Sequence, residues 1–466
     1  MSKTDERSIL IRGAMAVIGR SVAQKDLLIK GERIAAVGDL SDLAADEIID
    51  AGGLLAFPGA VDTHVHFNEI FSGTNSVHDY YSGTLAAAFG GVTSIIDFSN
   101  QIAGEPLART VEIKHEEARG NALIDWGVHP GITDPTGAII AEIPAVVELG
   151  APTMKCYMTY REEGLMTEPE EMQRVLAALS EAGGMLMVYA EDNALIEENV
   201  SRLLDQRLSA PRFYALSKAP EVENSAVRRA IGMVRETGGR LFFVHLSTVD
   251  AMQMVAAAKE EGLGVLAETC THYLVFSEEA LERDDAIRWI CSPPLRSRRD
   301  VEALWHGLGS GVISMVSSDD AAFSRRAEEC RGGRFEKCPN GMAGVEPRLP
   351  VLYSEGVAKG RIPLPMFVEL AAAAPARLFG MKGKGSLTPG YDADIVLFDP
   401  HARWRMSPET LHSGNDFSVF HGLEITGKVE KVFSRGELLV DGDECVAERG
   451  RGRYIKRKLA PALHRE

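Results

Sequence analysis

His64 and His66 are the residues whose type and spacing point most directly to chemistry. They end the apolar segment 53–63, in which Pro58 and Gly59 separate two short runs. The second run is typical of a β-strand, on which residues i and i+2 point to the same face. Two imidazoles at a strand end can therefore bind one metal ion from the same side. Alone the pair is a weak motif, because two histidines near a strand end are also ordinary polar residues.

Three more polar residues lie at or near the ends of strand-like apolar segments: Lys155, His245 and Asp319. Each has an ordinary explanation by itself: Lys155 as a surface lysine, His245 as a hydrogen-bonded core histidine and Asp319 as a helix N-cap. Together with His64 and His66 they form five metal-compatible side chains on four separate strands. The combination favours a metal site over five unrelated structural roles.

The elements that would position these residues alternate between apolar runs and amphipathic stretches. The segments that resemble buried parallel strands are 92–98, 153–157, 185–189, 240–245, 264–268 and 312–319. Helical stretches such as 168–182 and 226–237 follow some of them. Repeated βα units over about 320 residues predict an α/β protein with a (β/α)8 TIM-like barrel, whose active site lies at the C-terminal strand ends.

Both ends of the chain are rich in short β-segments. These segments are 9–12, 26–30, 33–37, 392–399, 429–433 and 437–440. We therefore expect residues 1–57 and 386–448 to form one small β-sandwich domain from both chain ends. Residues 58–385 are then the barrel that carries the metal-compatible residues, and residues 449–466 are a basic C-terminal tail that we expect to dock on a neighbouring subunit.

The composition excludes several classes of protein. A formal net charge of −17 argues against a nucleic-acid-binding surface as the main function. The N-terminus has no apolar signal core, and no segment is long enough to span a membrane. The cysteines are scattered without a C-x-x-C pair, which is typical of reduced thiols in a cytoplasmic protein. They are Cys156, Cys270, Cys291, Cys330, Cys338 and Cys445.

Several motifs resemble those of a known enzyme family. The segment 57–66, Phe-Pro-Gly-Ala-Val-Asp-Thr-His-Val-His, is similar to the strand-one signature of the amidohydrolase superfamily. Further segments are similar, in order and at comparable spacing, to motifs of its dihydropyrimidinase/hydantoinase branch. They are 83–93, 268–270, 291–296, 339–341 and 450–457. The chain is identified by this resemblance as a member of that branch.

The resemblance implies a binuclear metal site. His64, His66 and Asp319 would hold the more buried ion, and His245 would bind the second. CO2 would carbamylate Lys155, which turns an ammonium into a bridging anionic ligand. Zinc is the expected divalent metal, with cobalt or manganese as alternatives and one or two ions per subunit. The resemblance also implies a homotetramer, or a dimer.

The implied reaction is hydrolysis of a cyclic amide or ureide C–N bond by metal-activated hydroxide. Asp319 would orient the hydroxide and carry its proton to the leaving nitrogen of the small-molecule substrate. Tyr160 would donate a hydrogen bond to the developing oxyanion. Ser292 and Asn340 match positions at which relatives hold the ureide or imide edge through backbone groups.

Two residues depart from the family pattern. Tyr189 stands where relatives have a histidine ligand, and Asp320 stands where they commonly carry histidine. Either Tyr189 ligates as a phenolate, or Glu191 or water substitutes, or the second metal is weak or absent. We expect the third outcome, with one well-occupied metal. Asp320 adds negative charge near the site, which would change substrate choice or strengthen cation retention.

These departures leave two alternative functions open. One is a specialised hydrolase of a non-cyclic amide, urea or carbamate with a mononuclear site. The other is a non-catalytic scaffold that resembles the collapsin response mediator proteins, which share the fold but lack the metal ligands. The retained ligand positions favour the enzyme, because scaffolds lose most of that set.

Overall fold

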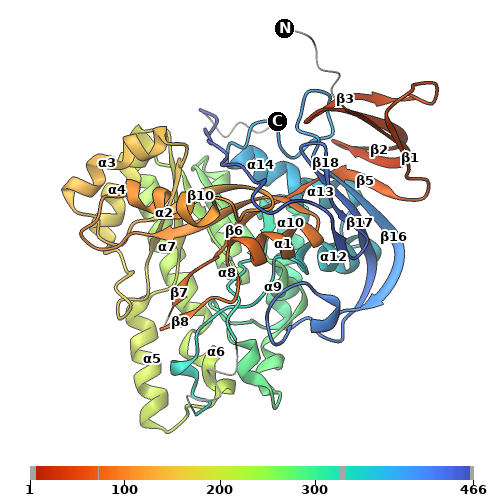
Figure 1. The fold of residues 1–466 in the computed structure, drawn as a ribbon. Helices are drawn as coiled ribbons and strands as arrows, with labels where there is room; N and C mark the ends of the chain where they lie inside the picture. Colours follow the sequence, from red (N-terminus) through yellow and green to blue (C-terminus); the bar gives the residue numbers. More distant parts are fainter. Residues whose placement is uncertain (1–6, 72, 325–331, 462–466) are drawn as a thin grey trace.

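Eight parallel strands curve into a barrel at the centre of the protein (Figure 1). The computed structural model describes residues 7–71, 73–324 and 332–461. The barrel strands are β6 (Ala60–Val65), β9 (Val92–Asn100), β10 (Asp125–Gly131), β11 (Thr153–Tyr157), β12 (Met185–Tyr189), β13 (Leu241–Phe243), β14 (Val265–Cys270) and β15 (Met315–Ser317). They neighbour one another in chain order, and nearly all of their residues are buried, as in parallel sheets covered by helices.

The barrel closes between its first and last strands, immediately beside the predicted metal ligands. Val65 forms a parallel bridge with Asp320. The amide of His66 donates to the carbonyl of Asp320 at 2.8 Å, and the amide of Asp320 donates to the carbonyl of His64 at 3.3 Å. These bonds bring the C-terminal ends of β6 and β15 together.

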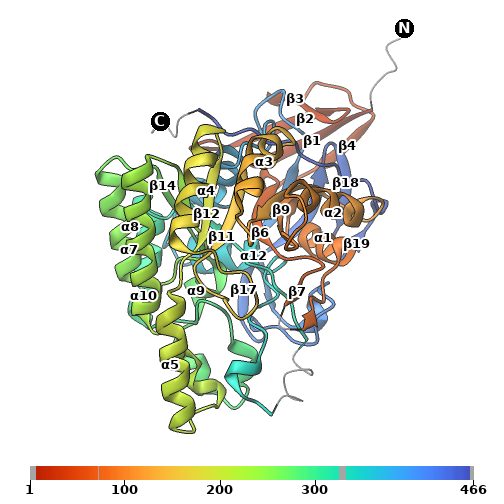
Figure 2. The same ribbon diagram turned by 90° about the vertical axis from the view of Figure 1, so that its left-hand side faces the viewer.

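Helices connect successive strands and cover the outside of the barrel (Figure 2). They are α1 (Tyr80–Phe89), α2 (Ala108–Ala118), α3 (Gly137–Glu148), α4 (Pro169–Glu181), α5 (Asn193–Asp205), α6 (Tyr214–Ser217), α7 (Pro220–Thr237), α8 (Val249–Glu260), α9 (Thr271–Val275), α10 (Arg298–Ser310), α12 (Arg348–Leu352), α13 (Leu364–Val368) and α14 (Ala374–Leu378). Side-chain caps begin several of them, including Thr248 at α8 and Ser297 at α10.

A second sheet combines the two ends of the chain, so red and blue strands lie side by side in Figure 1. Its strands are β1 (Ser8–Ile18), β2 (Ser21–Lys30), β3 (Arg33–Gly38), β4 (Glu47–Asp50), β5 (Leu55–Pro58), β16 (Ile395–Arg405), β17 (Glu424–Ser434), β18 (Glu437–Asp441) and β19 (Glu444–Cys445). β5 joins the halves by pairing parallel to β1 and antiparallel to β16. The predicted TIM-like barrel with an additional β-domain built from both chain ends is confirmed. The strands of that domain form one sheet where a β-sandwich was predicted, and the domain boundaries stay predictions.

The basic tail packs on its own chain. Arg457 is 2% exposed and donates to the carbonyl of Val128 at 2.5 Å and to the hydroxyl of Thr153 at 2.8 Å. Arg453 pairs with Glu32 of the additional sheet at 2.6 Å. The tail therefore contacts both the barrel and the additional sheet of its own chain, and its docking on a neighbouring subunit stays a prediction.

No helix in the described ranges is long and apolar enough to cross a membrane. Cys156, Cys270 and Cys445 are free thiols, and Cys330 lies outside the described ranges.

Replacing Arg457 should destabilise the protein without touching the predicted site. Arg457→Met leaves buried carbonyls and the Thr153 hydroxyl without their donor, which should lower the free energy of unfolding by about 3 kcal/mol. Urea denaturation measures this change. Lys458→Met removes an exposed charge from the next residue and should have little effect. Equal stability of the two variants would show that Arg457 does not anchor the tail.

Candidate metal centre and substrate pocket

His64 and His66 point the same ring nitrogen toward one carboxylate. His64 Nε2 lies 3.0 Å from Asp319 Oδ1, and His66 Nε2 lies 3.5 Å from the same oxygen. Their other nitrogens are occupied: His64 Nδ1 lies 2.5 Å from Glu268 Oε1, and His66 Nδ1 contacts Glu69. Such carboxylate partners fix the ring orientation of metal-ligating histidines and raise their basicity.

His245 and Asp319 follow the short strands β13 and β15, and both have a left-handed backbone. Their φ angles are 38° and 50°. This conformation costs about 1–3 kcal/mol for a non-glycine residue and is concentrated at functional sites. The His245 ring centroid lies 5.5 Å from that of His64. The backbone turns thus bring side chains from β6, β13 and β15 to one point.

The donor set fits a divalent cation. The ligand atoms of His64, His245 and Asp319 lie within 4.8 Å of one another. Both ring nitrogens of His245 are buried and have no hydrogen-bond partner among the described residues. Burial lowers the pKa of His245 well below its usual range, so the ring is neutral. Burial opposes the ionisation of Asp319, but His64 and His66 outweigh it and hold the pKa of Asp319 well below its usual range.

Lys155 reaches the same place from β11. It is 1% exposed, and its Nζ lies 4.0 Å from the ring centroid of Phe98 and 5.0 Å from that of Tyr157. Burial is the main cause that lowers the pKa of Lys155. A desolvated amine of this kind is more often neutral, and therefore more nucleophilic, than a surface lysine.

Tyr189 lies at the end of β12, and its ring and its neutral phenol hydroxyl both contact neighbouring side chains. Its ring packs edge-on against His245, with centroids 4.4 Å apart, and its hydroxyl lies 3.0 Å from that of Tyr160. Burial raises the pKa of Tyr189 well above its usual range. Glu191 is also engaged, since its carboxylate accepts from Lys218 Nζ at 2.5 Å. These contacts oppose ligation by a Tyr189 phenolate or by Glu191.

A cleft of about 520 Å³ adjoins the centre. Tyr160, Ser292 and Asn340 line it, together with His66, Lys155, His245 and Asp319. Phe71, Leu165 and Phe323 supply an apolar side of the same cleft. A small molecule bound there would meet polar donors and acceptors on one side and apolar side chains on the other.

Asp320 is turned away from this cleft. Its carboxylate lies 2.8 Å from His78 Nδ1 and accepts from the amides of Gly344 and Val345 at 3.2 and 3.3 Å. His78 Nε2 in turn lies 2.9 Å from the hydroxyl of Ser413. Asp320 therefore anchors the strand end that carries Asp319, rather than adding a free charge to the pocket.

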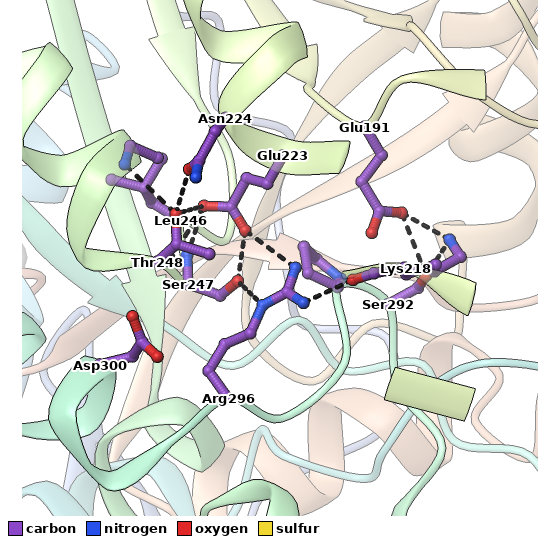
Figure 3. Close-up of polar contacts among 12 residues, drawn as sticks. Glu191, Lys218, Glu223, Asn224, Leu246, Ser247, Thr248, Ser292, Arg296 and Asp300 are labelled. Atoms are coloured by element: carbon purple, nitrogen blue, oxygen red, sulfur yellow. Dashed lines mark hydrogen bonds and ion pairs between the residues drawn. The ribbon is translucent and has the colours of Figure 1, made fainter. Parts of the chain in front are cut away.

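A hydrogen-bonded network connects the polar wall of the cleft. The hydroxyl of Tyr214 donates to the amide oxygen of Asn340 at 2.8 Å and lies 3.0 Å from the hydroxyl of Ser292. The amide of Asn340 donates to the hydroxyl of Tyr160 at 3.3 Å. Lys218 donates to Ser292 as well as to Glu191 (Figure 3). The buried Lys218–Glu191 ion pair thus fixes a hydroxyl that faces the cleft.

A second buried ion pair holds the segment that follows His245. Arg296 pairs with Glu223 at 3.4 Å and donates to the carbonyl of Lys218 at 2.5 Å (Figure 3). Glu223 also accepts from the amide of Ser247 at 3.0 Å. The two ion pairs therefore link the polar wall of the cleft to the metal-ligand loop.

Sequence reasoning missed the supporting residues Glu69, Glu268, Lys218 and Tyr214. Glu268 carried a usable signal, because it belongs to a strand-end motif, residues 268–270. The others come from loops and a short helix, and their side-chain directions have no periodic signature.

Comparisons with known proteins agree with this geometry. The amidohydrolase family matches residues 55–439. The chain is 38% identical over 459 residues to the D-hydantoinase of Geobacillus stearothermophilus, and this match covers 97% of each protein. It is 36% identical over 464 residues to the D-hydantoinase of Streptomyces coelicolor, covering 97% of this chain and 99% of that one. The crystal structure of dihydropyrimidinase from Brevibacillus agri is similar with a TM-score of 0.95 and 38% identity, covering 97% of this chain and 99% of that chain.

Removing the carboxylate behind His64 should weaken cation binding. Glu268→Ala takes away the acceptor that orients the ring, and affinity for zinc should fall about 10–100-fold. Competition with a chromogenic chelator measures the affinity. Glu279→Ala removes an exposed carboxylate paired with Arg298 and should leave it unchanged. If both variants bind zinc as tightly as the unchanged chain, Glu268 does not support the centre.

Proposed function

Because the chain belongs to the amidohydrolase family, and to its hydantoinase and dihydropyrimidinase branch, we propose that it hydrolyses a C–N bond in the ring of a cyclic amide or ureide. One observation carries the proposal: Lys155, His245 and Asp319 share a cleft with hydrogen-bonding groups suited to an amide ring. This set also argues against the alternative of a non-catalytic scaffold.

His64, His66, Lys155, His245 and Asp319 are the proposed ligand set, for zinc or alternatively cobalt or manganese. A divalent cation held there supplies Lewis acidity, which makes hydroxide available near neutral pH and polarises the scissile carbonyl. We expect the position at His64, His66, Lys155 and Asp319 to be the well-occupied one. The position beside Tyr189 lacks an imidazole and should be weak.

Lys155 becomes an anionic ligand by reaction with CO2. The neutral Nζ forms a bond to the carbon of CO2 and loses a proton, which leaves a carbamate with two oxygens. The lowered pKa of Lys155, caused mainly by burial, supports this step because it increases the fraction of neutral amine. The anion replaces a cation that a nearby metal would repel.

The remaining residues bind the substrate and move protons. Asp319 accepts the proton of the attacking water and delivers it to the ring nitrogen as the C–N bond breaks. The Tyr160 hydroxyl donates to the carbonyl oxygen as it gains negative charge. Ser292 and Asn340 hold the opposite edge of the amide. Water thus adds across the bond, giving a carboxylate and a free ureide or amide nitrogen.

We infer a homotetramer or dimer by analogy with the family, and a cytoplasmic location from the scattered cysteines. The acidic balance of the chain agrees with a small-molecule substrate rather than nucleic acid.

A substrate panel with metal control tests the proposed function. The zinc-, cobalt- or manganese-loaded chain should open hydantoin, dihydrouracil or a cyclic imide, and removal of the metal by a chelator should abolish turnover. Asp319→Asn should lower kcat by about 10²–10⁴-fold, because the proton acceptor is lost. The exposed Asp284→Asn serves as the matched control. Activity confined to linear amides or carbamates would show that the substrate is not cyclic. Inactivity with every metal would refute the proposal that the protein is an enzyme.

Lys218 should act on substrate binding through Ser292. Lys218→Met breaks the ion pair with Glu191 and frees the Ser292 hydroxyl, so KM should rise about tenfold, the cost of one or two hydrogen bonds. Bound metal should stay constant, since Lys218 contacts none of the proposed ligands. Lys218→Arg should restore most of the loss. Lys359→Met, at an exposed ion pair, is the control; an unchanged KM in Lys218→Met would exclude this positioning role.

A further inference from the structure

Cys270, His272 and Asp319 bring a thiol, an imidazole and a carboxylate together beside the proposed centre. Each offers one ligand atom, and these atoms lie within 4.8 Å of one another. Cys270 is 0% and His272 is 1% exposed, and the side chain of Asp319 is 13% exposed. The proposed mechanism uses neither the thiol nor this imidazole.

The end of β14 explains why Cys270 lies there. Cys270 is two residues after Glu268 on the strand, so both side chains lie on one face, and Glu268 contacts His64. β14 pairs with β15 so that Cys270 is opposite Ser317, and their side chains lie 3.4 Å apart. Ser317 ends the strand that leads to Asp319.

His272 contributes a ring nitrogen without a hydrogen-bond partner to this cluster. Its Nε2 is buried and has no hydrogen-bond partner among the described residues. Leaving such a polar atom buried and unpaired costs about 1–3 kcal/mol. The described part of the chain leaves the ring nitrogens of His245 in the same state. Coordination of a cation would satisfy the His272 nitrogen in the same way.

The surrounding charge favours a cation. The thiol of Cys270 lies in the field of the carboxylates of Asp319, Glu268 and Asp62. Arg348 pairs with Asp62 at 3.3 Å and so offsets one of the three. A divalent ion would offset the others, and it would stabilise the thiolate that forms when the thiol releases its proton to solvent.

We propose that Cys270, His272 and Asp319 bind a second divalent cation of thiophilic type, zinc or cobalt, with Asp319 shared between two ions. Thiolate ligands select such metals over manganese or magnesium. Pairs of ions about 3.5–4 Å apart are common in hydrolases. The second ion then lies beside β14, instead of beside β12 where Tyr189 replaces an imidazole. This goes beyond the proposed function, which needs only the first ion.

Cobalt titration of the metal-free, full-length chain tests the inference. The chain should take up two cobalt ions, and a thiolate-to-cobalt charge-transfer band should appear in the near ultraviolet. Cys270→Ser and, separately, His272→Gln should bind one ion, and Cys270→Ser should lose the band. Cys445→Ser removes a thiol from β19 of the additional sheet and should keep both ions and the band. Circular dichroism identifies any variant that fails to fold, and the other variant then carries the test.

The outcomes separate this inference from the proposed function. One bound cobalt without a thiolate band overturns the second position and leaves the first. No bound cobalt overturns both. A band that survives in Cys270→Ser assigns it to another thiol and overturns the inference. In His64→Asn the band should persist, and its loss would assign the thiolate to the first ion and overturn the two-position arrangement.

Discussion

Closure of the barrel between β6 and β15 is the constraint on which the site depends. The backbone bonds of Asp320 with His64 and His66 fix the first and last barrel strands to each other. They therefore set the distance between the two imidazoles and Asp319, which precedes Asp320. A shift of one residue in this pairing would turn the side chains to the opposite face and remove the ligand cluster. The backbone pairing of β6 with β15 therefore determines which side chains can bind one metal ion together.

Buried charges around the centre come in pairs that join separate segments. Lys218 with Glu191 and Arg296 with Glu223 connect the loops after β12 and β13 to the wall of the cleft. A buried pair contributes little net stability, but breaking one is costly because the remaining charge is left without a partner. The value of these pairs lies in holding Ser292 and the segment after His245 in single positions.

Much of the fold could be predicted because its signals are periodic. Apolar strands alternating with helices gave the barrel, and the strand ends indicated where His64, Lys155 and His245 would lie. The partners of Asp320 and Tyr189 could not be predicted. His78 and Tyr160 belong to loops, so their contacts depend on turn geometry and side-chain direction rather than on spacing. The same reason explains why Lys218 was missed, since it follows a one-turn helix.

The tail also has a consequence for how the protein is made. Arg457 caps carbonyl groups within the barrel, and β16 pairs with β5 from the start of the chain. Both contacts use segments that are translated after the barrel strands. The βα units of the barrel can form during synthesis, but the additional sheet and the tail anchor cannot be completed until residues 395–457 have left the ribosome. During this interval the nascent barrel lacks these contacts, and it is then that a chaperone would be most useful.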